Sequence, residues 1–118
     1  MNPATMLRVH DAIEHCAEDC ARSFEACTRT ATHCLELGGR HAEAVHINLL
    51  LDCAEICRTS EAVLRRGSAR YSLICWACAQ ICRACAADCE RLSGGDRVMD
   101  ECAAYCRRCA ESCEDVAA

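Results

Sequence analysis

The sequence has few large side chains and no lysine. Its 118 residues include only one Phe, one Trp and two Tyr. Aromatic rings therefore cannot fill the interior of a domain of this length, and another residue type must do so. All 13 basic residues are arginines, which keep their charge in surroundings where a lysine could lose it.

Two further absences restrict the function. The chain has no run of about 18 apolar residues, so we expect no membrane-spanning helix. Its N-terminal stretch, MNPATMLRVHDAIEHC, is polar and lacks the apolar region of a signal peptide. The net charge of −5 argues against nucleic acid as a partner. We therefore expect a cytoplasmic protein that binds neither nucleic acid nor membrane.

Cysteine is the residue that the sequence has in excess. There are 15 cysteines in the chain, well above the level of roughly 8–10% that marks an unusual framework. Thiols stay reduced in the cytosol. An odd number of cysteines also fits poorly with a fully paired disulfide scaffold. We therefore expect free thiols, which can fill the core in place of rings.

The spacing of the cysteines indicates helices. In SARYSLICWACAQICRACAADCERL, residues 68–92, the gaps between successive cysteines alternate between three and four. That alternation places every thiol on one face of a helix, whereas a strand would scatter the thiols over both faces. The segment therefore predicts a helix with one continuous stripe of sulfur.

The same pattern recurs along the chain and predicts an all-α fold. Helices are expected over residues 3–37, 40–66, 69–92 and 97–116. Asn2, Ser68 and Asp96 are the expected N-caps, and the helices are separated by Gly38-Gly39, Gly67-Ser68 and Gly94-Gly95. Loops of a few residues favour an antiparallel up-down-up-down four-helix bundle, with a cysteine-lined core and residues 1–118 as one domain.

The candidate metal ligands are the cysteines of these stripes and two further residues on them. They are Cys16, Cys20, Cys27, Cys34, Cys53, Cys57, Cys75, Cys78, Cys82, Cys85, Cys89, Cys102, Cys106, Cys109, Cys113, His46 and Met99. One or two buried cysteines would be ordinary core residues. Leu or Ala would pack equally well without the redox liability of a thiol. The large number of cysteines on matching stripes therefore indicates metal binding.

The arrangement favours several Cu(I) ions. Soft thiolate ligands select Cu(I), Zn or iron–sulfur clusters. A structural zinc site needs a closed tetrahedron, and iron–sulfur ligands usually lie in loops. Thiols along uninterrupted helices suit many ions of low coordination number. The capacity would be about seven ions with unshared thiolate pairs, and roughly 15 if every thiolate bridged two ions.

Two other classes of function stay open. The CxxC pairs 75/78, 82/85 and 106/109 would suit a thiol redox protein, although no βαβ pattern surrounds them. A zinc or iron–sulfur protein is the second alternative. We expect no Cys-His-Asp arrangement and no other catalytic group, and hence no enzyme activity.

The bundle topology predicts two unlike ends. The loading end, where metal is expected to enter, gathers Cys34, His46, Cys89, Met99 and Cys102. The opposite end is expected to be closed by an apolar plug of Met6, Val9, Ile13, Leu64, Tyr71 and Val116. His33 and His41 lie near the loading end but off the stripes, so we expect them to be solvated. His10 and His15 are expected on the surface.

Several segments resemble the bacterial copper storage proteins. The resemblance rests on INLLLDCAEIC (47–57), CRACAADCER (82–91) and CAAYCRRCAESC (102–113), and it extends over essentially the whole chain. It implies a four-helix bundle whose core thiolates store Cu(I) and buffer cytosolic copper. The family has exported and cytosolic branches, and the missing signal-peptide region makes this chain resemble the cytosolic one. The resemblance also implies a homo-oligomer such as a tetramer.

The chain departs from the fullest pattern of that family at a few positions. Ser23, Thr30, Ser60 and Met99 occupy steps of the stripes where a cysteine would be expected. The linker LSGGDRVMD (92–100) contains no histidine, although a histidine-rich linker is associated with the family. These departures bear on the copper capacity and on the loading route.

Overall fold

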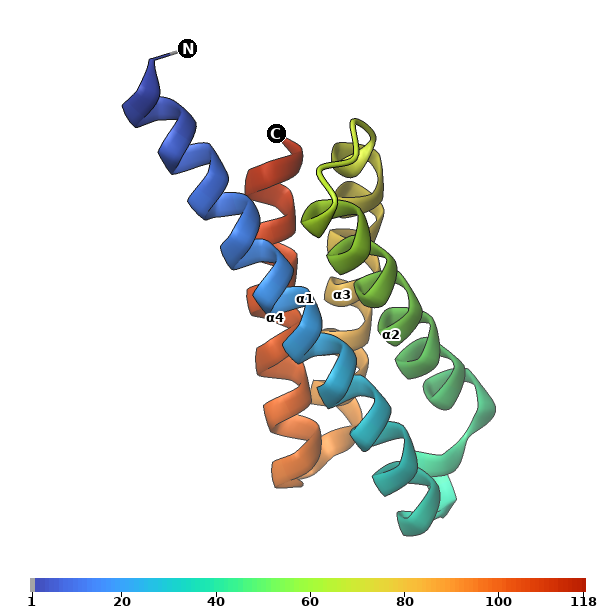
Figure 1. The fold of residues 1–118 in the computed structure, drawn as a ribbon. Coiled ribbons are helices and arrows are strands. Elements are labelled where there is room, and N and C mark those ends of the chain that lie inside the picture. Colours follow the sequence, from blue (N-terminus) through green and yellow to red (C-terminus); the bar gives the residue numbers. More distant parts are fainter. Residues whose placement is uncertain (1) are drawn as a thin grey trace.

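Four long helices form an antiparallel bundle (Figure 1). The structure, a computed structural model, describes residues 2–118, so residue 1 of the predicted 1–118 domain lies outside the described part. The elements are α1 (Pro3–Leu37), the short 3-10 helix η1 (Gly39–Ala42), α2 (Ala44–Arg65), α3 (Tyr71–Ser93) and α4 (Arg97–Ala117). No strand occurs among these residues. The predicted all-α, up-down-up-down fold is confirmed.

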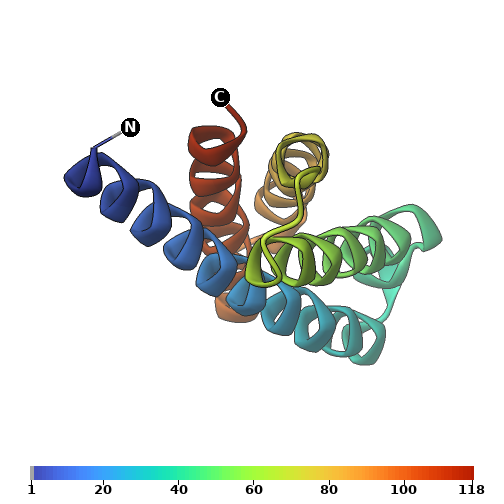
Figure 2. The same ribbon diagram turned by 45° about the horizontal axis from the view of Figure 1, so that its top comes forward.

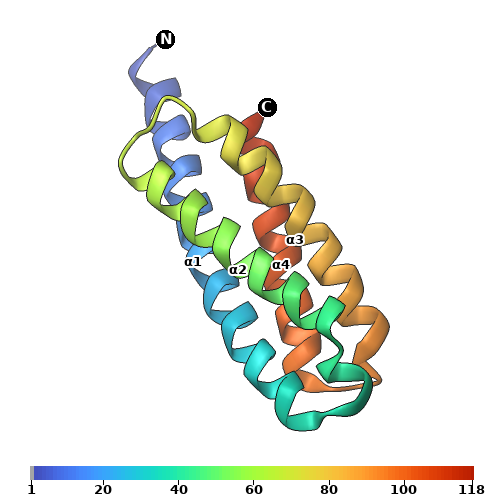
Figure 3. The same cartoon turned by 90° about the vertical axis from the view of Figure 1, so that its right-hand side faces the viewer.

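Each helix packs against two others. α1 contacts α2 and α4, and α3 contacts the same two helices. Figure 3 shows the α1–α2 and α3–α4 pairs running side by side along the length of the molecule. All four inward faces therefore meet along one central axis, which is where the sequence places the cysteines.

The helix ends follow local signals in the sequence. The Asn2 side chain accepts the Thr5 N–H at 2.8 Å and begins α1. The Asp96 carboxylate accepts the Met99 N–H at 2.9 Å and begins α4. Ser68 is not a side-chain cap of α3, because its hydroxyl accepts the N–H of Arg70, one residue before the helix begins. Two of the three predicted caps therefore form.

The second helix starts later than predicted. We expected it from residue 40, but α2 begins at Ala44. Gly38 and Gly39 both have positive φ, of 72° and 56°, and lead into η1 instead of directly into a helix. Glu43 then adopts an extended conformation before α2. The chain therefore makes a wider connection here than two glycines alone would suggest.

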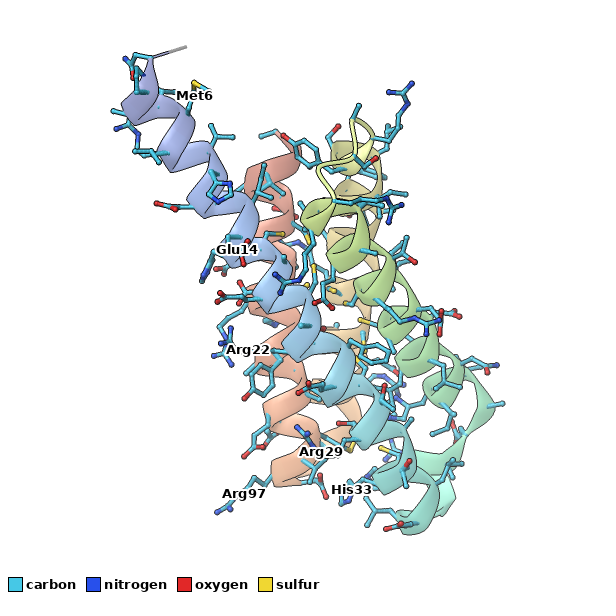
Figure 4. All side chains as sticks on the ribbon, in the orientation of Figure 1. Met6, Glu14, Arg22, Arg29, His33 and Arg97 are labelled. Atoms are coloured by element: carbon cyan, nitrogen blue, oxygen red, sulfur yellow. The ribbon has the colours of Figure 1, made fainter. Side chains whose placement is uncertain are left out.

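The predicted apolar plug is wrong at two of its residues. Met6 and Val9 are 57% and 41% exposed. α1 has 35 residues against 23 or fewer in the other helices, so at about 1.5 Å per residue its N-terminal turns extend past the bundle. Figures 2 and 4 show this overhang, and Figure 4 labels Met6 on it. Apolar side chains on one helix stay exposed where no partner helix packs against them.

The remaining plug residues do lie at that end. Leu64 is buried, whereas Ile13, Tyr71 and Val116 are half-buried. A pocket of about 180 Å³ lies between the last three residues and Val9. The end is thus apolar but is not sealed as predicted.

Candidate metal centre

The cysteines form the core of the bundle. All 15 are free and buried, and none is more than 1% exposed. Figure 4 shows sulfur atoms in the space enclosed by the ribbons. Small alanines at neighbouring core positions, such as Ala79, Ala86 and Ala110, let the helices approach closely. The thiols of all four helices therefore face one another across the axis.

Sulfur atoms from different helices approach to within contact distance. Cys57 Sγ of α2 lies 3.5 Å from Cys82 Sγ of α3. Cys16 Sγ of α1 lies 3.6 Å from Cys113 Sγ of α4. The four stripes thus pack together into one sulfur core instead of four separate rows.

Four groups of thiols are compact enough for one ion to reach every sulfur of the group. Within each group all sulfurs lie within 4.8 Å of one another. The groups are Cys16/Cys75/Cys113, Cys20/Cys78/Cys109/Cys113, Cys57/Cys78/Cys82/Cys109 and Cys27/Cys53/Cys85/Cys106. Because the first three groups share members, they form one continuous assembly. The fourth shares none.

A hydroxyl lies where these two assemblies meet. Ser23 Oγ accepts the Cys57 thiol at 3.3 Å and lies 3.6 Å from Cys106 Sγ. A direct sulfur contact between the assemblies, at 3.6 Å, joins Cys53 and Cys82. Ser23 is fully buried, so it takes a place in the core that a thiol could occupy.

The other two hydroxyl residues of the stripes are buried as well. Thr30 is 1% exposed and Ser60 is not exposed at all. The Ser60 hydroxyl has no hydrogen-bond partner among the described residues. The assignment of these positions to the core is thus confirmed, although their side chains add no soft ligand.

Three cysteines lie outside the compact groups, toward the loading end. The Cys102 thiol donates to Cys27 Sγ at 3.9 Å, and Cys89 and Cys34 follow further along the axis. Cys34 Sγ faces the ring of His46, whose Nε2 lies 3.4 Å away. Met99 is fully buried. The structure therefore places a thioether and an imidazole among the thiols at this end, and it brings the imidazole into contact with a thiol.

The contact between Cys34 and His46 extends to a carboxylate. His46 Nδ1 lies 2.7 Å from Asp88 Oδ2, and Arg91 donates to Oδ1 of the same carboxylate at 2.6 Å. Burial raises the pKa of Asp88, but hydrogen bonds from Arg91 and His46 lower it below its ordinary value overall. The expectation that the chain has no Cys-His-Asp arrangement is therefore wrong.

Sequence reasoning missed Asp88 because it lies off the cysteine stripe of α3. The available signal was its position directly before Cys89, at the border of a stripe made of Cys and Ala. Without the packing of α2 against α3, nothing in the sequence pairs residue 88 with residue 46.

Two further histidines hold the loading end together. His33 Nε2 lies 2.8 Å from Asp96 Oδ2, and His41 Nε2 lies 3.0 Å from the Leu92 carbonyl oxygen. Both side chains are half-buried, so the expectation that they are solvated is wrong. His33 links α1 to the α3–α4 connection, and His41 links η1 to the last turn of α3. Figure 4 shows His33 close to the start of α4. His10 and His15 are exposed as expected.

Protonation of the thiols differs along the core. Burial, followed by the charge of Asp96, raises the pKa of Cys34 to about 11. Hydrogen bonds from Cys109 and then Cys53 lower the pKa of Cys57 to about 6, whereas thiol contacts led by Cys106 raise the pKa of Cys53. Neighbouring thiols cannot all ionise together, because each thiolate repels the next. An incoming cation would therefore have to displace protons.

The comparison with known sequences gives the same picture. A sequence model described as copper storage protein matches residues 9–118. The chain belongs to the copper storage protein family. The matched region includes every cysteine, and it excludes only the first turns of the α1 overhang.

Solved structures of copper storage proteins share this fold. The Cu(I)-bound copper storage protein BsCsp3 of Bacillus subtilis is 34% identical, with a TM-score of 0.84 over 91% of this chain and 99% of that one. A cytosolic copper storage protein from Streptomyces lividans, solved during copper loading with five coppers, is 30% identical. Its TM-score is 0.80 over 92% of this chain and 94% of that one. The solved copper storage proteins that share this fold therefore include Cu(I)-bound and copper-loaded ones.

A third similar structure comes from Nitrosospira multiformis. It is 44% identical, with a TM-score of 0.85 over 91% of this chain and 95% of that one.

Within residues 2–118 of the present copper storage protein, no helix is long and apolar enough to cross a membrane.

Proposed function

We propose that this member of the copper storage family binds several Cu(I) ions along its core and holds them as a store that buffers cellular copper. The observation that carries the proposal is the continuity of the thiol core, where sulfurs from four helices approach to 3.5–4.0 Å and are shielded from water. Cu(I) bound there would be unable to reach oxidants in solution.

The proposed ligands are the 15 cysteines, with His46 and Met99 at the loading end. Thiolates shared between groups, such as Cys78, Cys109 and Cys113, suit bridging of two ions. Bridging raises the capacity above the roughly seven ions that unshared pairs would allow, toward a limit of roughly 15. Ions would enter past Met99 and His46 and move inward from thiol to thiol.

The packing of the core favours Cu(I) over zinc. Zinc would use isolated sets of four ligands arranged as a tetrahedron. Three of the four compact groups share sulfurs. Cys34 belongs to none of these groups and has the imidazole of His46 beside it. Low-coordinate Cu(I) can use shared sulfurs and single pairs equally well.

The same packing disfavours a thiol redox enzyme. Such an enzyme needs a reactive cysteine that is open to solvent beside a resolving partner. The CxxC pairs 75/78, 82/85 and 106/109 are buried. We therefore propose a non-catalytic role.

We further propose that residues 1–118 act as one storage domain in the cytoplasm and that the chains assemble as a homo-oligomer.

An anaerobic titration tests the proposal. Reduced protein is titrated with Cu(I) in the presence of a coloured Cu(I) chelator, and bound copper is counted per chain. We expect several equivalents to be taken up before the chelator competes. Saturation at one equivalent would contradict storage. Rapid oxidation of a single CxxC pair by peroxide, before the other thiols react, would favour the redox alternative.

A further inference from the structure

The Asp88 carboxylate contacts the ring of His46 and a second partner. His46 is 2% exposed. One oxygen of Asp88 faces His46 Nδ1, and the other accepts a hydrogen bond from Arg91. The Asp88 side chain is only 14% exposed. The ring is thus fixed from the α3 side, and its second nitrogen points at Cys34 Sγ.

The chemistry of these groups sets which nitrogen carries the hydrogen. An ionised carboxylate only accepts hydrogen bonds, so Nδ1 of His46 must carry the hydrogen that Asp88 accepts. In the neutral ring, Nε2 then has a free lone pair directed at Cys34. A cation between Nε2 and Sγ would have one nitrogen and one sulfur ligand without any rotation of the ring.

We propose that Asp88 is a positioning residue for copper loading, which holds His46 in the tautomer whose Nε2 can receive Cu(I) together with Cys34. The inference rests on the proposed storage function. It adds a residue that touches neither the metal nor a thiol. Carboxylates that accept the second N–H of a ligating histidine commonly orient the ring and increase its basicity.

Arg91 determines which way an amide at position 88 would face. In an Asp88→Asn variant, the Arg91 guanidinium can only donate, so it would take the amide oxygen and leave the amide NH₂ facing His46. That NH₂ would donate to Nδ1 and move the ring hydrogen to Nε2. The lone pair would then face away from Cys34. Removing Arg91 as well would allow the amide to turn round and restore the original tautomer.

The experiment compares wild type, Asp88→Asn, Asp88→Asn/Arg91→Ala and Arg91→Ala. Glu90→Gln serves as a matched control, because it removes an exposed carboxylate of α3 that pairs with Arg107 instead. Uptake of a first equivalent of Cu(I) from its bicinchoninate complex is followed by stopped flow, and the His46 tautomer is read from ¹⁵N NMR. Total capacity is measured in parallel.

We expect Asp88→Asn to slow the first uptake by roughly 10-fold or more, within the 10–100-fold range for such partners. It should also move the His46 hydrogen to Nε2. The double variant should regain much of the rate, whereas Arg91→Ala and Glu90→Gln should match wild type. Capacity should fall by no more than about one ion, since one pair of ligands is affected.

Other results would overturn the inference. The first result is an Asp88→Asn variant that takes up Cu(I) at the wild-type rate. The second is a slow Asp88→Asn variant whose rate does not recover in Asp88→Asn/Arg91→Ala. Should Asp88→Asn fail to fold, the wild-type spectrum alone decides, because a neutral His46 with its hydrogen on Nε2 contradicts the proposal. If wild type itself takes up one equivalent or none, the storage function fails instead.

Discussion

The sulfur atoms of Cys27 and Cys106 lie 3.5 Å apart, although 79 positions separate the two residues in the sequence. The contact crosses from α1 to α4 at the centre of the bundle. It is typical of this core, where most thiols meet thiols of other helices. The behaviour of the core in solution therefore depends on such cross-helix contacts and on the few polar groups among them.

Replacement of a central thiol should lower capacity without unfolding the protein. Cys106 contacts Cys27 and Cys53. Cys106→Ser keeps the side-chain shape with a slightly smaller atom but removes a soft ligand, so we expect a loss of about one to two Cu(I) ions. Anaerobic copper analysis measures the loss, and circular dichroism checks the helices. Ala104→Ser on the exposed side of α4 is the control. An unchanged capacity would show that Cys106 is not a ligand.

Addition of a thiol at the junction of the two assemblies should raise capacity. Ser23 Oγ already lies within 3.6 Å of Cys57 and Cys106 sulfur. Ser23→Cys should therefore add about one Cu(I), because its sulfur would bridge both assemblies. Ser23→Ala is the matched control and should keep the wild-type capacity. Equal capacity of the Cys and Ala variants would mean that copper does not occupy this junction.

Met99 should affect the speed of loading more than its extent. Met99→Leu nearly conserves volume in this buried position, so its effect on folding should stay below about 1.5 kcal/mol. It removes the thioether, however, and we expect slower uptake of Cu(I) with nearly unchanged capacity. Stopped-flow uptake and end-point analysis measure the two quantities separately. A lower capacity at an unchanged rate would mean that copper enters elsewhere.

The reduced, copper-free protein should lose stability in alkali. Burial raises the pKa of Cys34 from 9.0 to about 11. A raised pKa favours folding below the ordinary value, and this contribution is lost as the pH rises from 9 to about 11. The loss should be of the order of 1–3 kcal/mol for this thiol. Anaerobic thermal unfolding at increasing pH measures it.

Two controls separate this effect from general alkaline denaturation. Cys34→Ser should show a smaller decrease over the same pH interval, because the titrating group is absent. Copper-loaded protein should show almost none at this site, since the thiolate is already formed. Stability that rises between pH 9 and 11 in the wild type would contradict the assigned direction of the Cys34 shift.

The sequence was sufficient to predict the core because the cysteines repeat with a helical period. Every predicted core cysteine, together with Ser23, Thr30 and Ser60, is buried. Periodicity reports which face of a helix is apolar. It does not report how far a partner helix extends, which is why Met6 and Val9 were misplaced.

The details of the loading end depended on packing between segments distant in sequence. His46 and Asp88 are 42 residues apart and meet only because α2 packs against α3. The contacts of His33 with Asp96 and of His41 with Leu92 likewise join segments that are distant in the sequence. Polar contacts of this kind depend on side-chain geometry to within an ångström, and no local pattern in the sequence encodes it.

The most direct test of the central claim is a crystal structure of the copper-loaded protein, with anomalous diffraction recorded at the copper edge. We expect a row of copper peaks along the bundle axis between α1, α2, α3 and α4, each within bonding distance of cysteine sulfur. Copper confined to surface side chains, or a core in which the thiols are paired as disulfides and hold no copper, would contradict the account.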